Sequence, residues 1–145
     1  MSSNGENVGP ELNQLRNQKL TLAGGSIAWW PCHIGDSCKI GNAGNIGSLA
    51  HIGASVIIGD NCSIGSNVIV RNTLIKNNVY ILDGCVIGKK GFGFFPNKNG
   101  NTRYPHIGIV IIEDNCEIGC GSTIDRGSLS NTVIGKNTFL DNQVH

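Results

Sequence analysis

The stretch that decides the fold is residues 33–70, HIGDSCKIGNAGNIGSLAHIGASVIIGDNCSIGSNVIV. Every sixth residue in it is aliphatic, and each isoleucine at these places is followed by glycine: Ile34, Ile40, Ile46, Ile52, Ile58 and Ile64, with Val70 as the next aliphatic place. A period of six fits neither an α-helix nor the two-residue alternation of a strand. It fits a coil with three flat sides per turn, each directing one aliphatic side chain to a common axis. The sequence therefore predicts an all-β fold, a parallel β-helix of hexapeptide repeats.

The repeat continues beyond Val70 with one slip and two interruptions. A step of five leads from Val70 to Ile75. Residues 89–105 carry no hexad and contain three phenylalanines among glycine, proline and asparagine, so we expect an inserted loop over about this range. The hexads resume at Ile112, Ile118 and Ile124 and, after four extra residues, at Ile134 and Leu140.

These limits define the expected domains. We predict a β-helix domain over residues 26–145 that is incomplete at its C-terminal end, because a solenoid needs a cap and the chain stops at His145 without one. Residues 1–25 carry no hexads and are mostly polar. We expect them to be partly disordered, or to form a short capping helix over Glu11–Leu22.

Composition excludes several kinds of partner. A net charge of +1 with 14% charged residues provides no basic face for nucleic acid and no polybasic membrane patch. No apolar run approaches the roughly 18 to 20 residues of a transmembrane helix. The N-terminus lacks the apolar segment of a signal peptide, so we expect a cytoplasmic protein.

The six cysteines favour packing over disulfides or zinc. Five of them occupy the hexad place that elsewhere holds alanine, valine, serine or threonine: Cys32, Cys38, Cys62, Cys85 and Cys116. Cys120 is out of this register, and no second pair is present to complete a zinc site with Cys116 and Cys120. We therefore predict no metal and no cofactor, and free thiols favour a reducing compartment.

Two histidines are predicted to stack. His33 and His51 are one coil of 18 residues apart, so we expect them to lie about 4.8 Å apart on the same outward corner. They form either a surface ladder or part of a metal site, which would need a third ligand. His106 lies where the inserted loop returns to the coil, and its role is open.

Four motifs resemble a known family. They are Gly91-Phe92-Gly93-Phe94, the segment 123–128 (TIDRGS), the segment 132–135 (TVIG) and the segment 140–145 (LDNQVH). In this order and spacing they resemble the UDP-3-O-acylglucosamine N-acyltransferases, which add the second acyl chain in bacterial lipid A synthesis. Hexads alone occur in many enzymes and non-enzymes, so the Gly-Phe-Gly-Phe and Ile-Asp-Arg-Gly motifs carry the resemblance. It covers about residues 34–145.

The resemblance implies a left-handed β-helix that forms a homotrimer with active sites between subunits. It also implies that an imidazole deprotonates the 2-amino group of a UDP-sugar substrate, which attacks the 3-hydroxyacyl thioester carried by acyl carrier protein. Asp141 falls on the aspartate that orients this base; the alternative is a plain corner residue. His145 matches a position near the cleft. Phe92, Phe94, Asn142 and Gln143 are expected to bind substrate.

The departures from the family pattern leave alternatives open. The family's base histidine lies in Ile-Ala-His-Asn, three residues beyond His145, so this chain alone is expected to be inactive. The family's nucleotide-binding domain, later coils and helical tail do not match either. The chain is accordingly the N-acyltransferase in truncated form or a non-catalytic trimeric scaffold derived from it. A weaker alternative is another hexapeptide enzyme, such as a different sugar acyltransferase or a zinc carbonic anhydrase.

Overall fold

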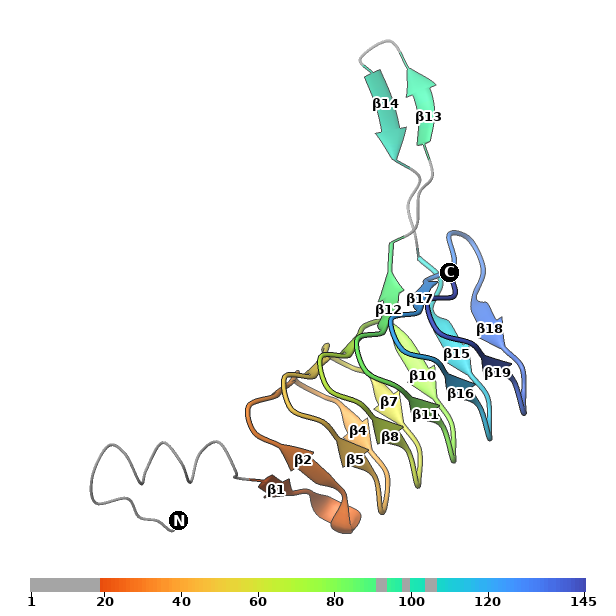
Figure 1. The fold of residues 1–145 in the computed structure, drawn as a ribbon. Coiled ribbons are helices and arrows are strands. Elements are labelled where there is room, and N and C mark those ends of the chain that lie inside the picture. The colour runs from red at the N-terminus through yellow and green to blue at the C-terminus, as the bar shows by residue number, and fades with distance from the viewer. Residues whose placement is uncertain (1–18, 91–93, 98–99, 104–106) are drawn as a thin grey trace.

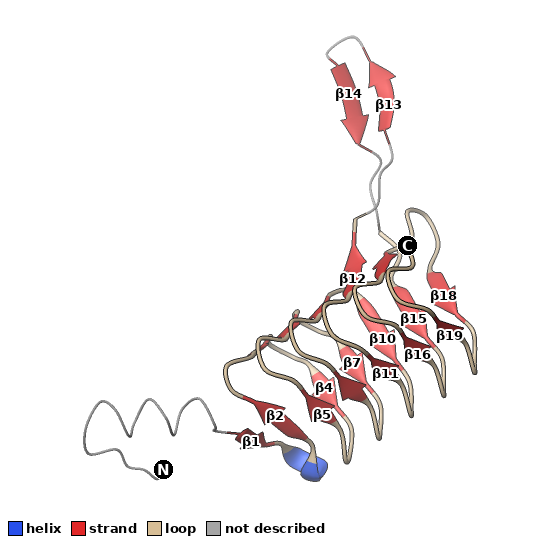
Figure 2. Ribbon diagram, in the orientation of Figure 1, coloured by secondary structure: helices blue, strands red, loops and turns tan. Residues whose placement is uncertain are grey.

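Short parallel strands stack into a three-sided coil (Figure 1). The computed structural model describes residues 19–90, 94–97, 100–103 and 107–145. Strands alternate with tight corners, as Figure 2 shows. The predicted all-β parallel β-helix is confirmed.

Each side of the coil is one sheet. Sheet A contains β1 (Lys19–Thr21), β2 (Ile27–Trp29), β5 (Asn45–Ile46), β8 (Ser63–Ile64), β11 (Tyr80–Ile81), β16 (Glu117–Ile118) and β19 (Phe139–Leu140). Sheet B contains β3 (His33–Ile34), β6 (His51–Ile52), β9 (Ile69–Val70), β12 (Val86–Lys89) and β17 (Thr123–Asp125). Sheet C contains β4 (Lys39–Ile40), β7 (Ile57–Ile58), β10 (Thr73–Ile75), β15 (Val110–Ile112) and β18 (Thr132–Ile134). Except for the antiparallel pair β1 and β2, neighbouring strands in these three sheets are parallel.

The core is the stack of aliphatic residues on the axis. Of the predicted core isoleucines, Ile46, Ile58, Ile64 and Ile118 are buried. Ile40 and Ile134 are only half-buried, which corrects the expectation for them. They lie on β4 and β18, the two edge strands of sheet C, where the core has a neighbouring coil on one side only.

The corners explain the glycines and asparagines of the repeat. One residue per corner adopts a left-handed conformation, and six of these are asparagine, which tolerates it best after glycine: Asn61, Asn67, Asn72, Asn78, Asn115 and Asn137. The glycine that follows most core isoleucines allows close approach of the next coil. A Cβ on Gly35 would lie 2.6 Å from the backbone nitrogen of Ala54.

The cysteines pack as predicted. Cys62, Cys85 and Cys116 are buried, Cys32 and Cys38 are half-buried, and all six cysteines are free. The Cys62 thiol donates to the Lys76 carbonyl of the next coil at 3.0 Å. Among the described residues, no group of three or more His, Cys, Asp or Glu side chains is placed to hold a metal ion.

The first coil is covered by a strand. Lys19–Thr21 form β1, which pairs antiparallel with β2, and Ala23–Gly25 form a 3-10 turn. The described end of the segment 1–25 is therefore a strand and a turn rather than a helix, because Leu20 and Thr21 continue the sheet. Residues 1–18, which include most of the expected helix over Glu11–Leu22, lie outside the described residues. In the part of the chain that is described, no helix is long and apolar enough to cross a membrane.

The inserted loop contains an antiparallel hairpin. The chain leaves the coil at the end of β12, and the described part of the loop is β13 (Phe94–Asn97) paired with β14 (Gly100–Arg103) (Figure 1). The coil then resumes with β15. The four extra residues after Ile124 lie at the equivalent corner one coil later, between β17 and β18.

Candidate functional site

Three side chains meet at the C-terminal end of sheet B. β17 alternates in burial, so Ile124 is in the core while Thr123 and Asp125 point outward. The pairing of β12 with β17 shifts by one residue after Ile87, which places Lys89 beside Asp125. Gly88 permits this shift: it has φ of 87°, and a Cβ there would lie 1.5 Å from the Arg71 carbonyl oxygen.

Asp125 shares its carboxylate between two partners. The Lys89 Nζ lies 2.8 Å from Oδ1, and the His145 Nε2 lies 3.4 Å from Oδ2. Oδ1 is a buried atom, so Lys89 provides the charge that compensates it. Burial acts to raise the pKa of Asp125, but the contacts with Lys89 and His145 outweigh it and hold the pKa below its usual value. Asp125 is therefore a carboxylate at neutral pH.

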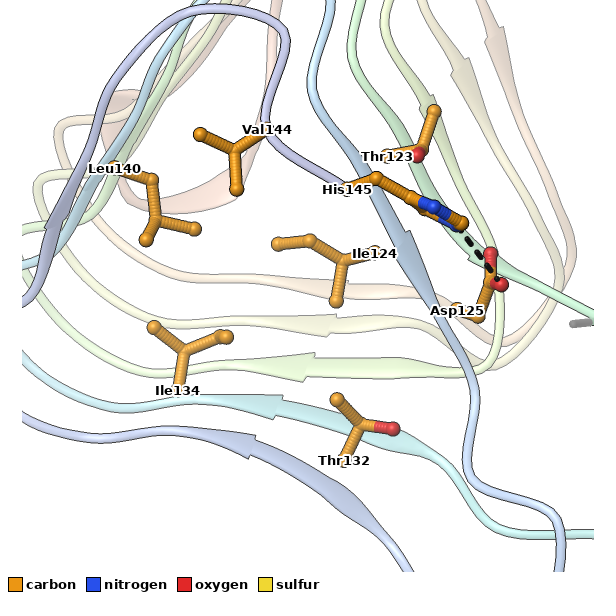
Figure 3. A pocket seen from close by; sticks show the side chains of 8 residues that line it. All are labelled: Thr123, Ile124, Asp125, Thr132, Ile134, Leu140, Val144 and His145. Carbon is orange, nitrogen blue, oxygen red and sulfur yellow. Dashed lines mark hydrogen bonds and ion pairs between the residues drawn. The ribbon is translucent and has the colours of Figure 1, made fainter.

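His145 reaches this carboxylate from the last corner. The backbone nitrogen of Thr123 donates to the Val144 carbonyl at 2.8 Å, which fixes the chain directly before His145. The imidazole is 68% exposed and turns its Nε2 toward Asp125 (Figure 3). A carboxylate only accepts hydrogen bonds, so this contact favours the tautomer with hydrogen on Nε2. When the ring is neutral, Nδ1 is then a hydrogen-bond acceptor.

A cavity of about 510 Å³ adjoins the cluster (Figure 3). Its apolar lining comes from core positions of the last coils, namely Ile124, Ile134, Leu140 and Val144. Its polar lining is Thr123, Asp125, Thr132 and His145. This apolar lining is the end of the core at the last coil, and His145 and Asp125 lie at its edge.

The Ile-Asp-Arg-Gly motif holds both legs of the inserted loop. On the departing leg, the backbone nitrogen of Arg126 donates to the Lys89 carbonyl at 2.9 Å. On the returning leg, the Arg126 Nε donates to the Gly108 carbonyl at 2.8 Å, and the Gly108 nitrogen donates to the Gly127 carbonyl at 3.0 Å. We call Lys89, Gly108 and residues 126–127 the stem.

The predicted residues Asp141, Asn142 and Gln143 form the corner after β19. Asp141 is exposed, and its Oδ1 accepts the backbone nitrogen of Asn142 at 2.8 Å. The Asn142 Oδ1 accepts the backbone nitrogen of Cys120 in the preceding coil at 2.8 Å. Gln143 is the left-handed corner residue, with φ of 58°. The carboxylate that lies against His145 is that of Asp125.

The Asn142 contact repeats one made at earlier corners. The backbone nitrogen of Asp60 donates to the Asn77 Oδ1, and the backbone nitrogen of Asn77 donates to the Asp114 Oδ1, at 2.8 and 2.9 Å. Asn142 therefore joins its coil to the one before it.

The remaining predicted site residues lie in the inserted loop. Phe92 and His106 are outside the described residues, and Phe94 is placed only by its backbone, as the first residue of β13.

The repeat pattern and the motifs did not indicate Lys89 or Asp125 as site residues. The available signal was the residue after a core isoleucine, which is glycine in most hexads but Asp125 after Ile124. Lys76 and Glu113 break the pattern in the same way, and they form an ion pair of 3.0 Å elsewhere on the coil. A charged residue in place of this glycine therefore indicates a partner in an adjacent coil.

The predicted stacking of His33 on His51 is confirmed. They pair across β3 and β6, with ring centroids 4.6 Å apart and ring planes 16° from parallel. Burial, followed by the nearby His33 and Arg71, lowers the pKa of His51.

Comparison with known proteins finds similar hexapeptide-repeat transferases. The bacterial transferase hexapeptide family (six repeats) matches residues 31–72. The UDP-3-O-acylglucosamine N-acyltransferase of Bradyrhizobium sp. (strain ORS 278) is 55% identical over 67 residues, which are 46% of this chain and 19% of that protein. Its namesake in Rhizobium rhizogenes is 52% identical over 66 residues, with the same coverage of 46% and 19%. The chain therefore spans less than a fifth of the length of these relatives, and over that region the predicted resemblance is confirmed.

Proposed function

We propose that this chain is part of an N-acyltransferase that moves a 3-hydroxyacyl chain from acyl carrier protein to the 2-amino group of UDP-3-O-acylglucosamine, and that residues 1–145 alone are inactive. The observation that carries the proposal is the 55% identity over 67 residues to an enzyme of that name. The contact of His145 with Asp125 is compatible with it, since a few convergent polar groups orient the substrate in such sites.

The reaction needs an oriented imidazole as the base and a thioester as the electrophile. The amine nitrogen attacks the thioester carbonyl carbon, the carbon–sulfur bond breaks, and the amine proton passes through an imidazole to the leaving thiolate. By resemblance the base is the histidine of the family's Ile-Ala-His-Asn segment, with Asp141 as its orienting carboxylate. His145 lies at the same cleft and offers Nδ1 to a donor on the substrate. We propose substrate contacts for Phe92, Phe94, Asn142 and Gln143.

We also propose that the protein is a cytoplasmic homotrimer with its clefts between subunits. Support for the trimer comes from an outward aliphatic column in register on sheet C: Ile57, Leu74, Ile111 and Val133. Ile57 is 42% exposed and Val133 54%. A second copy would remove such a column from water. The six free cysteines are compatible with the reducing cytoplasm.

The test is transfer of labelled 3-hydroxyacyl groups from acyl carrier protein to UDP-3-O-acylglucosamine by the product of the complete gene. Asp141→Ala should lower turnover, up to the factor of about 10² to 10⁴ that a positioned general base contributes, while thermal stability stays near that of the parent. Asp36→Ala, at an exposed corner of an early coil, is the matched control and should retain parental turnover. Absence of transfer by the parent would refute the proposal and favour the scaffold alternative, as parental turnover in Asp141→Ala would refute the role of Asp141.

A further inference from the structure

We propose that Asp125 is a positioning residue that holds the stem of the inserted loop and the imidazole of His145 as one unit. This inference rests on the proposed function for the identity of the substrate in the cleft, whereas the contacts among the three side chains are independent of that function. One carboxylate contacts Lys89 through Oδ1 and His145 through Oδ2. The loop and the histidine therefore meet at a single side chain.

The stem side of this unit is strongly fixed. Lys89 is bound twice by consecutive residues: its side chain pairs with Asp125, and its carbonyl accepts the backbone nitrogen of Arg126. Arg126 also binds the returning leg at Gly108. Asp125 is 22% exposed, so its carboxylate has little freedom to leave Lys89. The position of Oδ2 is set by these contacts.

The histidine side depends on the stem. An imidazole that is 68% exposed would sample several ring orientations and both neutral tautomers if nothing opposed it. Asp125 Oδ2 is the acceptor that selects Nε2–H and leaves Nδ1 as an acceptor. Loss of Lys89 frees the carboxylate and thereby frees the ring, although Lys89 does not itself bind His145.

This arrangement gives Asp125 a role in substrate specificity. A substrate that contacts the inserted loop acts on Lys89 and Gly108, and through Asp125 it sets the direction of the His145 Nδ1. The complementary group is an N–H or O–H donor, such as a hydroxyl or the amine of the 3-O-acylated amino sugar. The lowered pKa of Asp125 supports this role, because the carboxylate stays ionised over the neutral range.

The test uses nuclear magnetic resonance on the 145-residue chain. Long-range nitrogen–proton spectra report the His145 tautomer, and hydrogen exchange of the Arg126 and Gly108 amides reports the stem. Lys89→Met should move His145 from mainly Nε2–H to a mixture of tautomers and should accelerate stem exchange at least about threefold. Asp125→Asn should do the same.

Two further variants make the outcome decisive. Lys76→Met removes the equivalent ion pair with Glu113 and should leave His145 and the stem unchanged. Lys89→Arg keeps the charge and should restore the parental tautomer. A parental His145 spectrum in Lys89→Met overturns the coupling, as does a change of the same size in Lys76→Met. Neither measurement involves acyl transfer, so failure of the coupling and failure of the proposed enzyme are distinguishable.

Discussion

His33 stacks on His51 across adjacent coils, with ring centroids 4.6 Å apart. Burial is the main cause of the lowered pKa of His51, followed by repulsion from His33 and Arg71. The unfolded chain therefore binds a proton at His51 more readily than the folded one. Stability should fall as pH decreases from about 6.5 toward the lowered folded pKa.

Substitution of His51 tests this acid sensitivity. In His51→Ile the new side chain copies Ile69, the next residue of the column. This variant should show little change of the urea unfolding midpoint between about pH 7.5 and 5. His33→Gln should reduce the pH dependence of the midpoint only in part, because it removes the repulsion between His33 and His51 but leaves His51 buried to the same extent. An unchanged pH profile in His51→Ile would contradict the assignment.

Ile58 and Ile57 are adjacent residues with opposite environments. Ile58 is 3% exposed in the core and Ile57 is 42% exposed on sheet C. Ile58→Ala should cost about 2 to 5 kcal/mol of unfolding free energy through the cavity it leaves. Ile57→Ala should cost less on the isolated chain. Equal denaturant midpoints for the two variants would mean that the register is wrong.

Gly127 is required by close packing at the stem. A Cβ there would lie 1.5 Å from the Ser130 carbonyl oxygen, whereas a Cβ on Gly135 would meet nothing within 4 Å. Gly127→Ala should destabilise by about 1 to 3 kcal/mol and accelerate exchange of the Gly108 amide. Gly135→Ala is the matched control and should remain close to the parent in thermal unfolding. Similar melting temperatures for both would refute the packing at this corner.

Asp125 should stabilise the fold only where it is ionised. Its folded pKa is lowered, so its contribution is present above the unfolded value of about 3.9 and is lost as pH falls through the folded pKa. Asp125→Asn should therefore lower the urea midpoint at pH 7, and the difference from the parent should disappear near pH 2 to 3. A difference that persists at low pH would mean that the carboxylate charge is not the cause.

The fold could be predicted because the hexad is a local rule repeated many times. A single period places Ile46, Ile58 and Ile64 in the core and brings His33 over His51, so each repeat supports the same register. The slip at Val70 and the insertion after Ile87 were visible as breaks in that period. The half-burial of Ile40 and Ile134 was not predicted, because the period does not encode which strands lie at the edges of a sheet.

The site could be predicted only in part, because it depends on a departure from the period. Lys89 meets Asp125 through a one-residue shift at Gly88, and no regular spacing contains that shift. The motif that ends in His145 also contains Asp141, so it indicated Asp141 as the carboxylate of the site. The carboxylate that His145 contacts belongs to Asp125 in the coil before it, and this contact depends on how the coils stack.

The slip after Val70, the hairpin and the extra residues after Asp125 all occur where the chain passes from sheet B to sheet C. The parallel registers on both sides of this passage are kept, with Val86 beside Thr123 and Ile75 beside Ile112. The number of residues that connect sheet B to sheet C can therefore change without altering how the coils stack. The hairpin of β13 and β14 extends away from the coil at this edge (Figure 1), which makes the edge an attachment point for foreign peptides such as epitopes or affinity tags.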